Sequence, residues 1–562
     1  MEAPVFWIAV LCFVLVGYGV QGSPPMQPYR TGFHFQPSKN WMNGPVYHNG
    51  TYHLFYQYNP YGPLWGNMTW GHSISYDLVN WIHLDFALVR TDPYEINGCF
   101  SGSTTFLNPG KPVILYTGVD KEKRQTQNLA WPKNLSDPFL REWQKSPRNP
   151  LMRPVDDILP EYFRDPSTAW KGPDGKWRVI VGNEMNAGGQ VLLYRSKDFL
   201  RWTRRKNPLH SSNKTPMWEC PDFYPVSING MYGVDTSSQD KFTKYVLKAS
   251  MFPLDHDKYI LGSYSVKNDH FSPDTDFKGD ASDLRYDYGK FYASKSFFDS
   301  SKKRRILWGW INEADTEPDV IKKGWSGLQS VPRSILLSKN HKQLIQWPIK
   351  ELEKLRMKKV SFHDKELKGG SAVKVPGITA SQADVEVLFN LPSLKEAELM
   401  DPSWVDPQLL CSQNAASVRG KVGPFGLLVL ASKELQEKTA VFFRIFRSIH
   451  DKCVVLMCSD QSRSSLWEGL DTTTYGAFMD IDPSHEKISL RTLIDHSIIE
   501  SFGGEGRSCI TARVYPKLAI GNEADLYAFN NGTLDVTISS LNAWSMKKAR
   551  LASFNKRRKP LI

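Results

Sequence analysis

The sequence lacks long apolar runs after its first 20 residues, so no later segment reaches the roughly 18 unbroken apolar residues of a membrane-spanning helix. No membrane-spanning helix is therefore predicted after these first residues. The early run, Val5–Val20, is followed by the small and turn-forming residues QGSPP, as in a secretory signal peptide, although no Lys or Arg precedes Arg30. We therefore predict a signal peptide over residues 1–22, secretion to the extracellular space, and no membrane contact after its removal. A retained anchor or a mispredicted start is the alternative.

Cysteine is scarce, with seven residues among 562. One of them, Cys12, falls inside the predicted signal peptide, and the other six are too few and too scattered for a disulfide scaffold. No CxxC pair is present. One or two disulfides in the C-terminal half, or buried free thiols, are the alternatives for these cysteines: Cys99, Cys220, Cys411, Cys453, Cys458 and Cys509.

Long amphipathic helical patterns are also absent. Short runs rich in Val, Ile, Tyr, Phe and Trp recur instead between turn residues from residue 30 to the end. Two segments are alike, SISYDLVNW at 73–81 and YRSKDFLRW at 194–202, and WKGPDGKWRVIVG contains an Asp-Gly hairpin turn. Repeated four-stranded units of this kind predict the blades of a β-propeller over residues 30–350.

The pattern changes near residue 350. Residues 351–380 are rich in Lys and contain Gly-Gly, which predicts a connector with one or two helical turns. Later segments such as DVEVLFNL and FGLLVLAS alternate in the manner of strands, so we predict a β-sandwich over residues 381–546, followed by a basic tail at 547–562. The predicted fold class is all-β with two domains.

Acidic residues are outnumbered by basic ones, 58 against 70, which gives a net charge of +12. In a secreted protein this charge favours an acidic polymer or surface as a partner, held by salt-dependent attraction, and disfavours nucleic acid. A solvated tail that only aids solubility is the alternative. Five N-glycosylation sequons fit the secretory route: Asn49, Asn67, Asn134, Asn213 and Asn531.

Two acidic residues stand in apolar sequence, where a charge is costly unless it is paired or functional. Asp165 follows Arg164 in EYFRDPSTAW, and Glu219 lies between Trp218 and Cys220 in MWECPDFYPV. We expect burial to raise the pKa of Glu219, which makes it a proton donor near neutral pH, whereas the Arg164 guanidinium favours a charged Asp165 able to bind sugar hydroxyls. A turn or a structural ion pair is the alternative for either motif alone.

Aromatic residues near these turns predict a sugar-binding pocket, because the apolar faces of sugars stack on aromatic rings. Core packing is their commoner use. Asn43, Gln57 and Ser101 add polar groups able to orient hydroxyls in such a pocket. The aromatic residues are Trp41, Tyr56, Trp65, Trp70, Phe100 and Trp218.

An ordered set of motifs carries a resemblance to a known family. HFQPSKNWMN, HLFYQYNP, NGCFSGSTT, FRDPS, WECPDFYPV, QWP and LIDHSIIESFGGEGRSCITARVYP together resemble the plant acid invertases and fructan exohydrolases, glycoside hydrolases of the β-fructofuranosidase family. The likeness extends from residue 30 to about residue 545. It implies a five-bladed β-propeller followed by a β-sandwich.

The resemblance implies hydrolysis of terminal non-reducing β-D-fructofuranosides, in sucrose or fructans, with retention of configuration. It gives Glu219 the role of acid/base and Asp165 that of transition-state stabiliser, and it implies neither a metal nor a cofactor. With this likeness we expect a disulfide between Cys411 and Cys458. The expected substrate-binding residues are Trp41, Asn43, Gln57, Trp65, Phe100, Ser101 and Arg164.

One part of the family pattern is missing. The family's nucleophile motif reads Trp-Met-Asn-Asp-Pro-Asn-Gly, whereas this chain reads Trp41-Met42-Asn43-Gly44 and then resumes the pattern. Asp-Pro-Asn is therefore deleted, and the nucleophile is absent between Asn43 and Gly44. In plant genes of this family a very small exon commonly encodes that tripeptide, so a skipped exon explains the loss. Without a nucleophile no fructosyl ester forms, and we expect little activity from the chain as written.

The subtype rests on two features. Pro221 in WECPDF resembles the cell-wall group, which implies an apoplastic, cell-wall location and ionic association with acidic wall polysaccharide. Phe252 and Asp255 stand where cell-wall invertases have an Asp and a Lys, and this loss resembles fructan exohydrolases. Three hypotheses remain: a cell-wall invertase, a fructan exohydrolase, and a non-catalytic sugar-binding relative.

Overall fold

The computed structural model describes residues 27–37, 43–107, 110–155, 157–230, 232–238, 240–450 and 452–553. The predicted signal peptide, Trp41 and most of the predicted tail lie outside these residues. Strands dominate, and the described α-helices, α1 (Glu317–Lys323) and α2 (Pro407–Gln413), are short. In this part of the chain no helix is long and apolar enough to cross a membrane. Short 3-10 helices lie at Pro93–Glu95, Pro160–Tyr162, Lys350–Leu355, Leu394–Glu396, Gly504–Gly506 and Gly521–Glu523.

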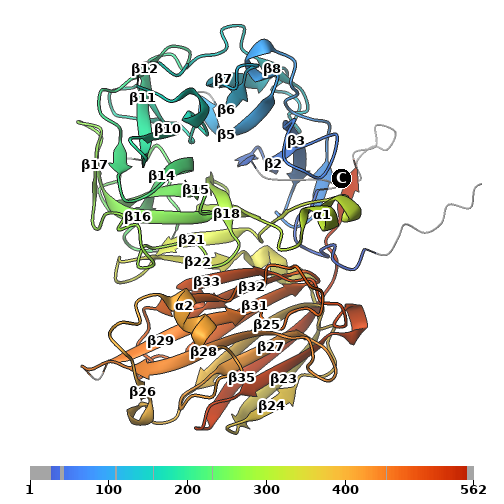
Figure 1. The fold of residues 1–562 in the computed structure, drawn as a ribbon. Coiled ribbons are helices and arrows are strands. Elements are labelled where there is room, and N and C mark those ends of the chain that lie inside the picture. Colours follow the sequence, from blue (N-terminus) through green and yellow to red (C-terminus); the bar gives the residue numbers. More distant parts are fainter. Residues whose placement is uncertain are drawn as a thin grey trace, which may run out of the picture.

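Five antiparallel sheets follow one another in chain order in the N-terminal part (Figure 1). The first contains β1 (Asn43–His48), β2 (Thr51–Tyr58), β3 (Thr69–Ser75) and β4 (Trp81–His83). The second contains β5 (Gly98–Leu107), β6 (Lys111–Val119), β7 (Gln125–Pro132) and β8 (Trp143–Lys145). The third contains β9 (Trp170–Lys171), β10 (Trp177–Met185), β11 (Gly188–Ser196), β12 (Trp202–Arg204) and β13 (His210–Ser212).

The fourth and fifth sheets complete this part. The fourth contains β14 (Met217–Ser227), β15 (Thr243–Phe252), β16 (His256–Ser265) and β17 (His270–Pro273). The fifth contains β18 (Tyr292–Asp299), β19 (Arg304–Ile311), β20 (Leu328–Gln329), β21 (Arg333–Leu337) and β22 (Leu344–Pro348).

Apolar cores fill the space between neighbouring sheets. Each sheet shares one core with the sheet before it and another with the sheet after it, and the fifth sheet shares a core with the first through residues such as Leu54 and Trp308. Strands such as β3 are therefore buried along their whole length, because both faces are covered. The inner strand β1 accordingly contacts both β5 and β18.

Two packed sheets form the C-terminal β-sandwich. One contains β23 (Arg356–Leu367), β35 (Val536–Met546), β25 (Gln382–Asn390), β31 (Ile488–Asp495), β32 (Ile498–Gly503) and β33 (Ser508–Arg513). The other contains β24 (Ser371–Lys374), β34 (Asp525–Asn530), β27 (Phe425–Ala431), β28 (Thr439–Arg447), β29 (Cys453–Asp460), β30 (Tyr475–Met479) and β26 (Glu398–Leu399). Their inward-facing aliphatic and aromatic side chains make one common core.

Two segments outside the predicted domains form strands. The expected connector, 351–380, contains β23 and β24, one in each sheet of the sandwich. Its Lys-rich composition has a physical reason, since β23 is an edge strand and exposed charges on an edge prevent pairing with other chains. Part of the predicted basic tail forms β36 (Leu551–Ser553), which pairs in parallel with β4 of the first sheet.

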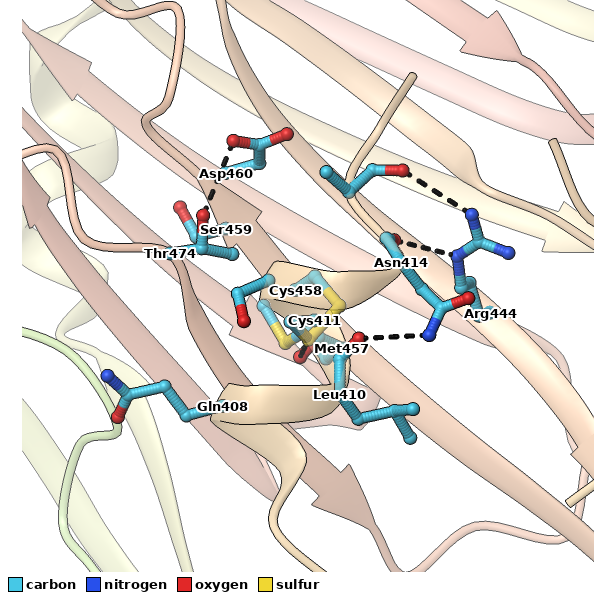
Figure 2. Close-up of a disulfide and its surroundings, with 12 residues drawn as sticks. Gln408, Leu410, Cys411, Asn414, Arg444, Met457, Cys458, Ser459, Asp460 and Thr474 are labelled. Atoms are coloured by element: carbon cyan, nitrogen blue, oxygen red, sulfur yellow. Dashed lines mark hydrogen bonds between the residues drawn. A yellow bond between two sulfur atoms is a disulfide. The ribbon is translucent and has the colours of Figure 1, made fainter. Parts of the chain in front are cut away.

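A disulfide joins Cys411 in α2 to Cys458 in β29, and Figure 2 shows the helix lying on that strand. The N-terminus of α2 is capped. The side chain of Asp406 accepts hydrogen bonds from two backbone N–H groups, and Pro407 occupies the first turn. The cysteines Cys99, Cys220, Cys453 and Cys509 carry free thiols.

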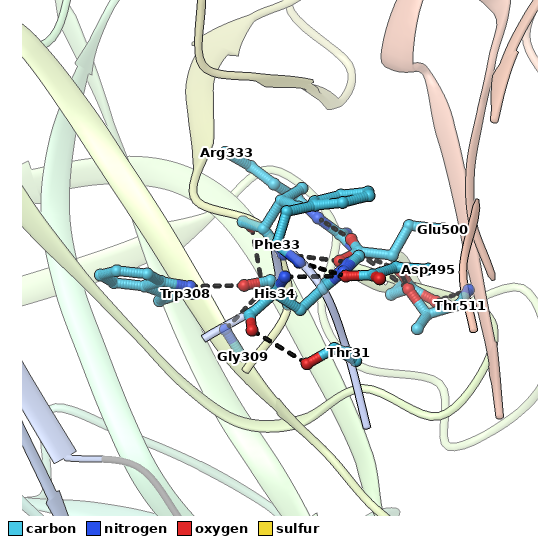
Figure 3. Close-up of polar contacts among 12 residues, drawn as sticks. Thr31, Phe33, His34, Trp308, Gly309, Arg333, Asp495, Glu500 and Thr511 are labelled. Carbon is cyan, nitrogen blue, oxygen red and sulfur yellow. Dashed lines mark hydrogen bonds and ion pairs between the residues drawn. The ribbon is translucent and has the colours of Figure 1, made fainter. Parts of the chain in front are cut away.

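A buried polar network links the N-terminal segment and the fifth sheet to the sandwich (Figure 3). His34 lies between two carboxylates of the sandwich, with Nδ1 at 2.8 Å from Asp495 and Nε2 at 3.0 Å from Glu500. Arg333 of β21 pairs with Glu500 and, at 2.9 Å, with Asp287. The long motif LIDHSIIESFGG therefore supplies the carboxylates of an interdomain clamp.

Candidate active site

A pocket of about 550 Å³ opens beside the inner strands of the N-terminal sheets. Side chains from the first, second, fourth and fifth sheets line it, together with the loop that precedes β9. The pocket brings together seven of the residues that the sequence predicts for a site: Gln57, Trp65, Phe100, Ser101, Arg164, Asp165 and Glu219.

Four inner strands carry a β-bulge near their start. A bulge adds one residue to a strand and turns the neighbouring side chains in a new direction. In β5, β14 and β18 the irregular stretch includes or directly borders residues that line the pocket, so the bulges present these side chains to it. The register shifts fall between Asn43 and Val46, Cys99 and Gly102, Glu219 and Asp222, and Tyr292 and Lys295.

Asp165 is held by the backbone around it. Arg164 and Gly182 of β10 exchange two backbone hydrogen bonds, and the Asp165 N–H donates to Thr117 Oγ1 at 2.8 Å. The residue has a φ of 66°, a left-handed conformation that is uncommon outside glycine and occurs where surrounding structure enforces it. Its Oδ2 accepts the N–H of Cys220 at 2.9 Å, which ties it to the bulge of β14.

Glu219 lies between a cation and a hydroxyl. Arg164 Nε donates to its Oε1 at 2.8 Å, and the Tyr292 hydroxyl donates to its Oε2. Burial raises the pKa of Glu219, the Arg164 guanidinium opposes this shift, and the negative charge of Asp165 adds to it. The carboxyl group therefore holds its proton to a higher pH than an ordinary glutamic acid while 17% of the side chain stays exposed to the pocket.

Aromatic and polar side chains also line the pocket. The rings of Trp65 and Phe100 meet edge to face at 5.6 Å, and Trp65 is 56% exposed. Gln57 Nε2 donates to Ser101 Oγ at 2.6 Å. This combination of an exposed aromatic side chain and oriented polar groups is typical of small-molecule sites that recognise hydroxylated ligands.

The junction between Asn43 and Gly44 lies at the start of β1. Trp41 and the side chain of Asn43 lie outside the described residues. Gly44 packs closely on the second sheet, because a Cβ at this position would approach Ser103 Cα and Thr104 N to 3.3 Å. The chain thus enters the first sheet directly beside β5, whose Phe100 and Ser101 line the pocket.

Comparison with known proteins matches both parts of the chain. Residues 34–348 match the glycosyl hydrolases family 32 N-terminal domain, and residues 351–545 match the family 32 C-terminal domain. The chain belongs to glycosyl hydrolase family 32. The resemblance seen in the sequence motifs is thereby confirmed, and the family makes the chain a glycosidase by class.

Individual family 32 proteins are similar over nearly their whole length. The insoluble β-fructofuranosidase isoenzyme CWINV1 of Arabidopsis thaliana is 57% identical over 94% of this chain and 92% of its own. Fructan 6-exohydrolase of Beta vulgaris is 54% identical over 93% of this chain and 88% of its own. The crystal structure of fructan 1-exohydrolase IIa from Cichorium intybus superposes with a TM-score of 0.92 at 54% identity, covering 94% of this chain and 99% of that one.

The family 32 pocket also contains residues that the sequence did not indicate. The Tyr292 hydroxyl donates a hydrogen bond to Glu219. Gln125 Oε1 accepts hydrogen bonds from the Arg164 guanidinium and from the backbone N–H of Phe163. A tyrosine at the start of YASKSFF reads only as a strand residue, and the bulge that turns it inward has no one-dimensional signature. The remaining additions are Glu161, Tyr162, Cys220, Ala293 and Trp310. Phe252 and Asp255, which the sequence indicated for the subtype, also line the pocket.

Proposed function

We propose that the chain is built to hydrolyse terminal non-reducing β-D-fructofuranosyl residues of sucrose or fructans. The names of its family 32 relatives support this substrate class, because they are β-fructofuranosidases and fructan exohydrolases, and a variant of the Cichorium enzyme has been crystallised with 1-kestose. The observation that carries the proposal is the setting of Glu219, an acid with a raised pKa between Arg164 and Tyr292 in a pocket that Trp65 also lines.

The geometry supports separate roles for the two carboxylates. Glu219, with its raised pKa, protonates the glycosidic oxygen of the leaving sugar and later activates water. Asp165, fixed by the Thr117 hydroxyl and the Cys220 N–H, accepts hydrogen bonds from fructose hydroxyls as the positive transition state develops. Gln57, Ser101, Trp65 and Phe100 orient the sugar, and the same role is proposed for Trp41 and Asn43.

We infer that the five N-terminal sheets are the blades of a five-bladed β-propeller over residues 30–350. The cores shared between each successive pair of sheets, and between the fifth and the first, support a closed ring. The sandwich begins soon after residue 350, in agreement with the match of the C-terminal family domain from residue 351.

We propose that the chain has little hydrolytic activity, because it lacks the nucleophile. Inserting Asp-Pro-Asn between Asn43 and Gly44 restores the family motif, so we expect hydrolysis of sucrose or fructan to rise by about 10⁴-fold or more. Purified parent and insertion proteins are compared for release of fructose from sucrose, inulin and levan. Equal hydrolysis by both proteins contradicts the missing-nucleophile proposal.

A matched variant separates true turnover from contamination. Glu219→Gln in the insertion protein keeps the shape of the pocket but removes the acid, and should lower kcat by about 10²- to 10⁴-fold. If neither protein turns over but both bind 1-kestose in calorimetry, the chain is a sugar-binding relative. Full activity of the Glu219→Gln protein overturns the acid/base role.

Between the two enzymatic candidates, one observation favours a fructan exohydrolase. Phe252 and Asp255 both line the pocket, and the resemblance implies that they replace an Asp and a Lys of cell-wall invertases. Phe252 is 39% exposed and packs against Arg164, so it offers an apolar rim in place of a hydrogen-bonding one. Faster hydrolysis of inulin or levan than of sucrose by the insertion protein supports this assignment, and the reverse supports an invertase.

We propose an apoplastic, cell-wall location with ionic association to acidic wall polysaccharide. The Arabidopsis relatives are named insoluble isoenzymes and the Pisum sativum relative a cell-wall isozyme, and the net charge of +12 suits such a partner. Four of the sequons are exposed and available to glycosylation: Asn49, Asn67, Asn134 and Asn213. Asn531 differs, because its amide donates to the carbonyls of Ala416 and Ser417.

A further inference from the structure

Two buried lysines hold the backbone that follows Glu219. Lys248 of β15 donates from Nζ to the carbonyl of Cys220 at 3.1 Å, and Lys295 of β18 donates from Nζ to the carbonyl of Pro221 at 3.0 Å. The two lysines are only 0% and 4% exposed. Burying an ammonium group is costly unless its partners compensate, so both placements require a reason.

The bulge of β14 creates the need for these donors. Glu219 faces Ser250 and Asp222 faces Lys248, so Cys220 and Pro221 share the single facing residue between them. A bulge disrupts the local ladder and leaves backbone groups that need other partners. The lysine ammonium groups supply those partners from two different strands, one on the same sheet and one on the next.

The same bulge also contacts both carboxylates that are proposed to act in catalysis. The Cys220 N–H donates to Asp165, and the Glu219 side chain reaches Tyr292. Cys220 has a left-handed φ of 44°, a conformation that persists only where surrounding contacts enforce it. Any relaxation of this turn therefore moves both carboxylates relative to each other.

We propose that Lys248 and Lys295 are positioning residues that hold the Glu219–Pro221 bulge and so fix the arrangement of the two proposed catalytic carboxylates. This inference rests on the proposed function. Lys295 is also linked to the site by charge. Burial lowers the pKa of Lys295, whereas the charges of Cys220, Asp222 and Asp165 oppose that shift.

The two lysines differ in what their removal leaves behind. Lys248 also pairs with the buried Asp257 at 3.0 Å, so its loss strands a charge and threatens the fold. Among the described residues Lys295 forms no ion pair with a carboxylate, and its Nζ bonds to the Pro221 carbonyl. Lys295→Met keeps the length of the side chain and is the informative variant.

The control residue lies on β16, the strand next to β15 in the fourth sheet. Lys258 of β16 is 3% exposed and pairs with Asp283 at 2.7 Å, away from the residues that line the pocket. Lys258→Met thus removes an equally buried lysine without touching the bulge, and Asp283 keeps its hydrogen bonds from the backbone N–H groups of Lys278 and Gly279. It reports the effect of a merely structural loss.

The first measurement uses the chain as written and needs no turnover. Iodoacetamide modification of each cysteine is followed by peptide mass spectrometry, with buried Cys509 as the internal reference. We expect Lys295→Met to speed modification of Cys220 at least about fivefold through local opening, and Lys258→Met to leave it unchanged. An unchanged rate in Lys295→Met, or the same increase in both variants, overturns the proposal.

The second measurement uses the Asp-Pro-Asn insertion protein. Lys295→Met should lower kcat by about 10²-fold with KM changed less than about threefold, and should move the acidic limb of kcat/KM to higher pH, because a nearby positive charge is lost. Faster Cys220 modification with unaltered kcat and pH profile overturns the positioning role. If the insertion protein with Lys295 intact is inactive, the proposed function fails, and Cys220 modification alone decides whether the lysines hold the bulge.

Discussion

The protonation of Glu219 is set by three neighbours, and one of them can be removed cleanly. Burial raises the pKa of Glu219, whereas the hydrogen bond from the Tyr292 hydroxyl favours the charged carboxylate and lowers it. Tyr292→Phe should therefore raise the pKa of Glu219 further. With Glu219 as the proposed proton donor, the basic limb of kcat/KM in the insertion protein should move up by about one pH unit, as expected for one hydrogen bond to a charged group.

The control for this profile is Tyr162→Phe. Tyr162 also lines the pocket, with its ring 5.7 Å from the Arg164 guanidinium, but among the described residues the side-chain hydrogen bonds of Glu219 come from Arg164 and Tyr292. A basic limb that stays in place, or moves to lower pH, in Tyr292→Phe contradicts the assigned role of its hydroxyl.

Sequence reasoning found the two carboxylates because a charge in apolar sequence is visible in one dimension. Asp165 and Glu219 both lie in the pocket, as do their predicted neighbours Gln57, Trp65 and Phe100. Tyr292 and Lys295 were not found. In YASKSFF both fit an ordinary half-buried strand, and their orientation depends on bulges and on contacts with β14, from which they are about 70 residues distant in sequence.

At the scale of the elements, a single substitution at Gly102 should disrupt the bulge of β5. Gly102 ends this bulge, and a Cβ there would lie 2.0 Å from the carbonyl oxygen of Leu115 on β6. Gly102→Ala must therefore push β5 away from β6, and with it the pocket residues Phe100 and Ser101. We expect a loss of about 3 kcal/mol or more in unfolding free energy and weaker 1-kestose binding.

Gly62→Ala is the matched control, because a Cβ at Gly62 meets no atom within 4 Å. Its urea midpoint and its calorimetric affinity for 1-kestose should equal those of the parent. The steric account of the β5 bulge is wrong if the midpoint of Gly102→Ala also equals that of the parent.

The pairing of β23 with β35 could not be predicted from the sequence, because the exposed lysines of this edge strand hide the alternation of a strand.

Across the whole molecule, His34 couples the domains in a pH-dependent way. Burial opposes the charged imidazolium, but hydrogen bonds and charges from Asp495 and Glu500 prevail and raise the pKa of His34. A raised pKa contributes stability that is complete below the unfolded-state value of about 6.5 and is lost as the pH rises through the folded-state value. The pKa values of Asp495 and Glu500 are lowered, so their contribution is present above about pH 4 and is lost as the pH falls through their folded-state values.

The clamp should therefore be strongest between about pH 4.5 and 6.5, and this window can be measured. His34→Gln removes the imidazolium and leaves two buried carboxylates with fewer partners, so we expect a loss of about 3 kcal/mol in unfolding free energy near pH 5 and a smaller loss near pH 9, from urea titrations. His341→Gln is the control, because the His341 ring bonds to the Ile228 carbonyl. Equal losses for His34→Gln at both pH values would show that the clamp acts through packing and not through charge.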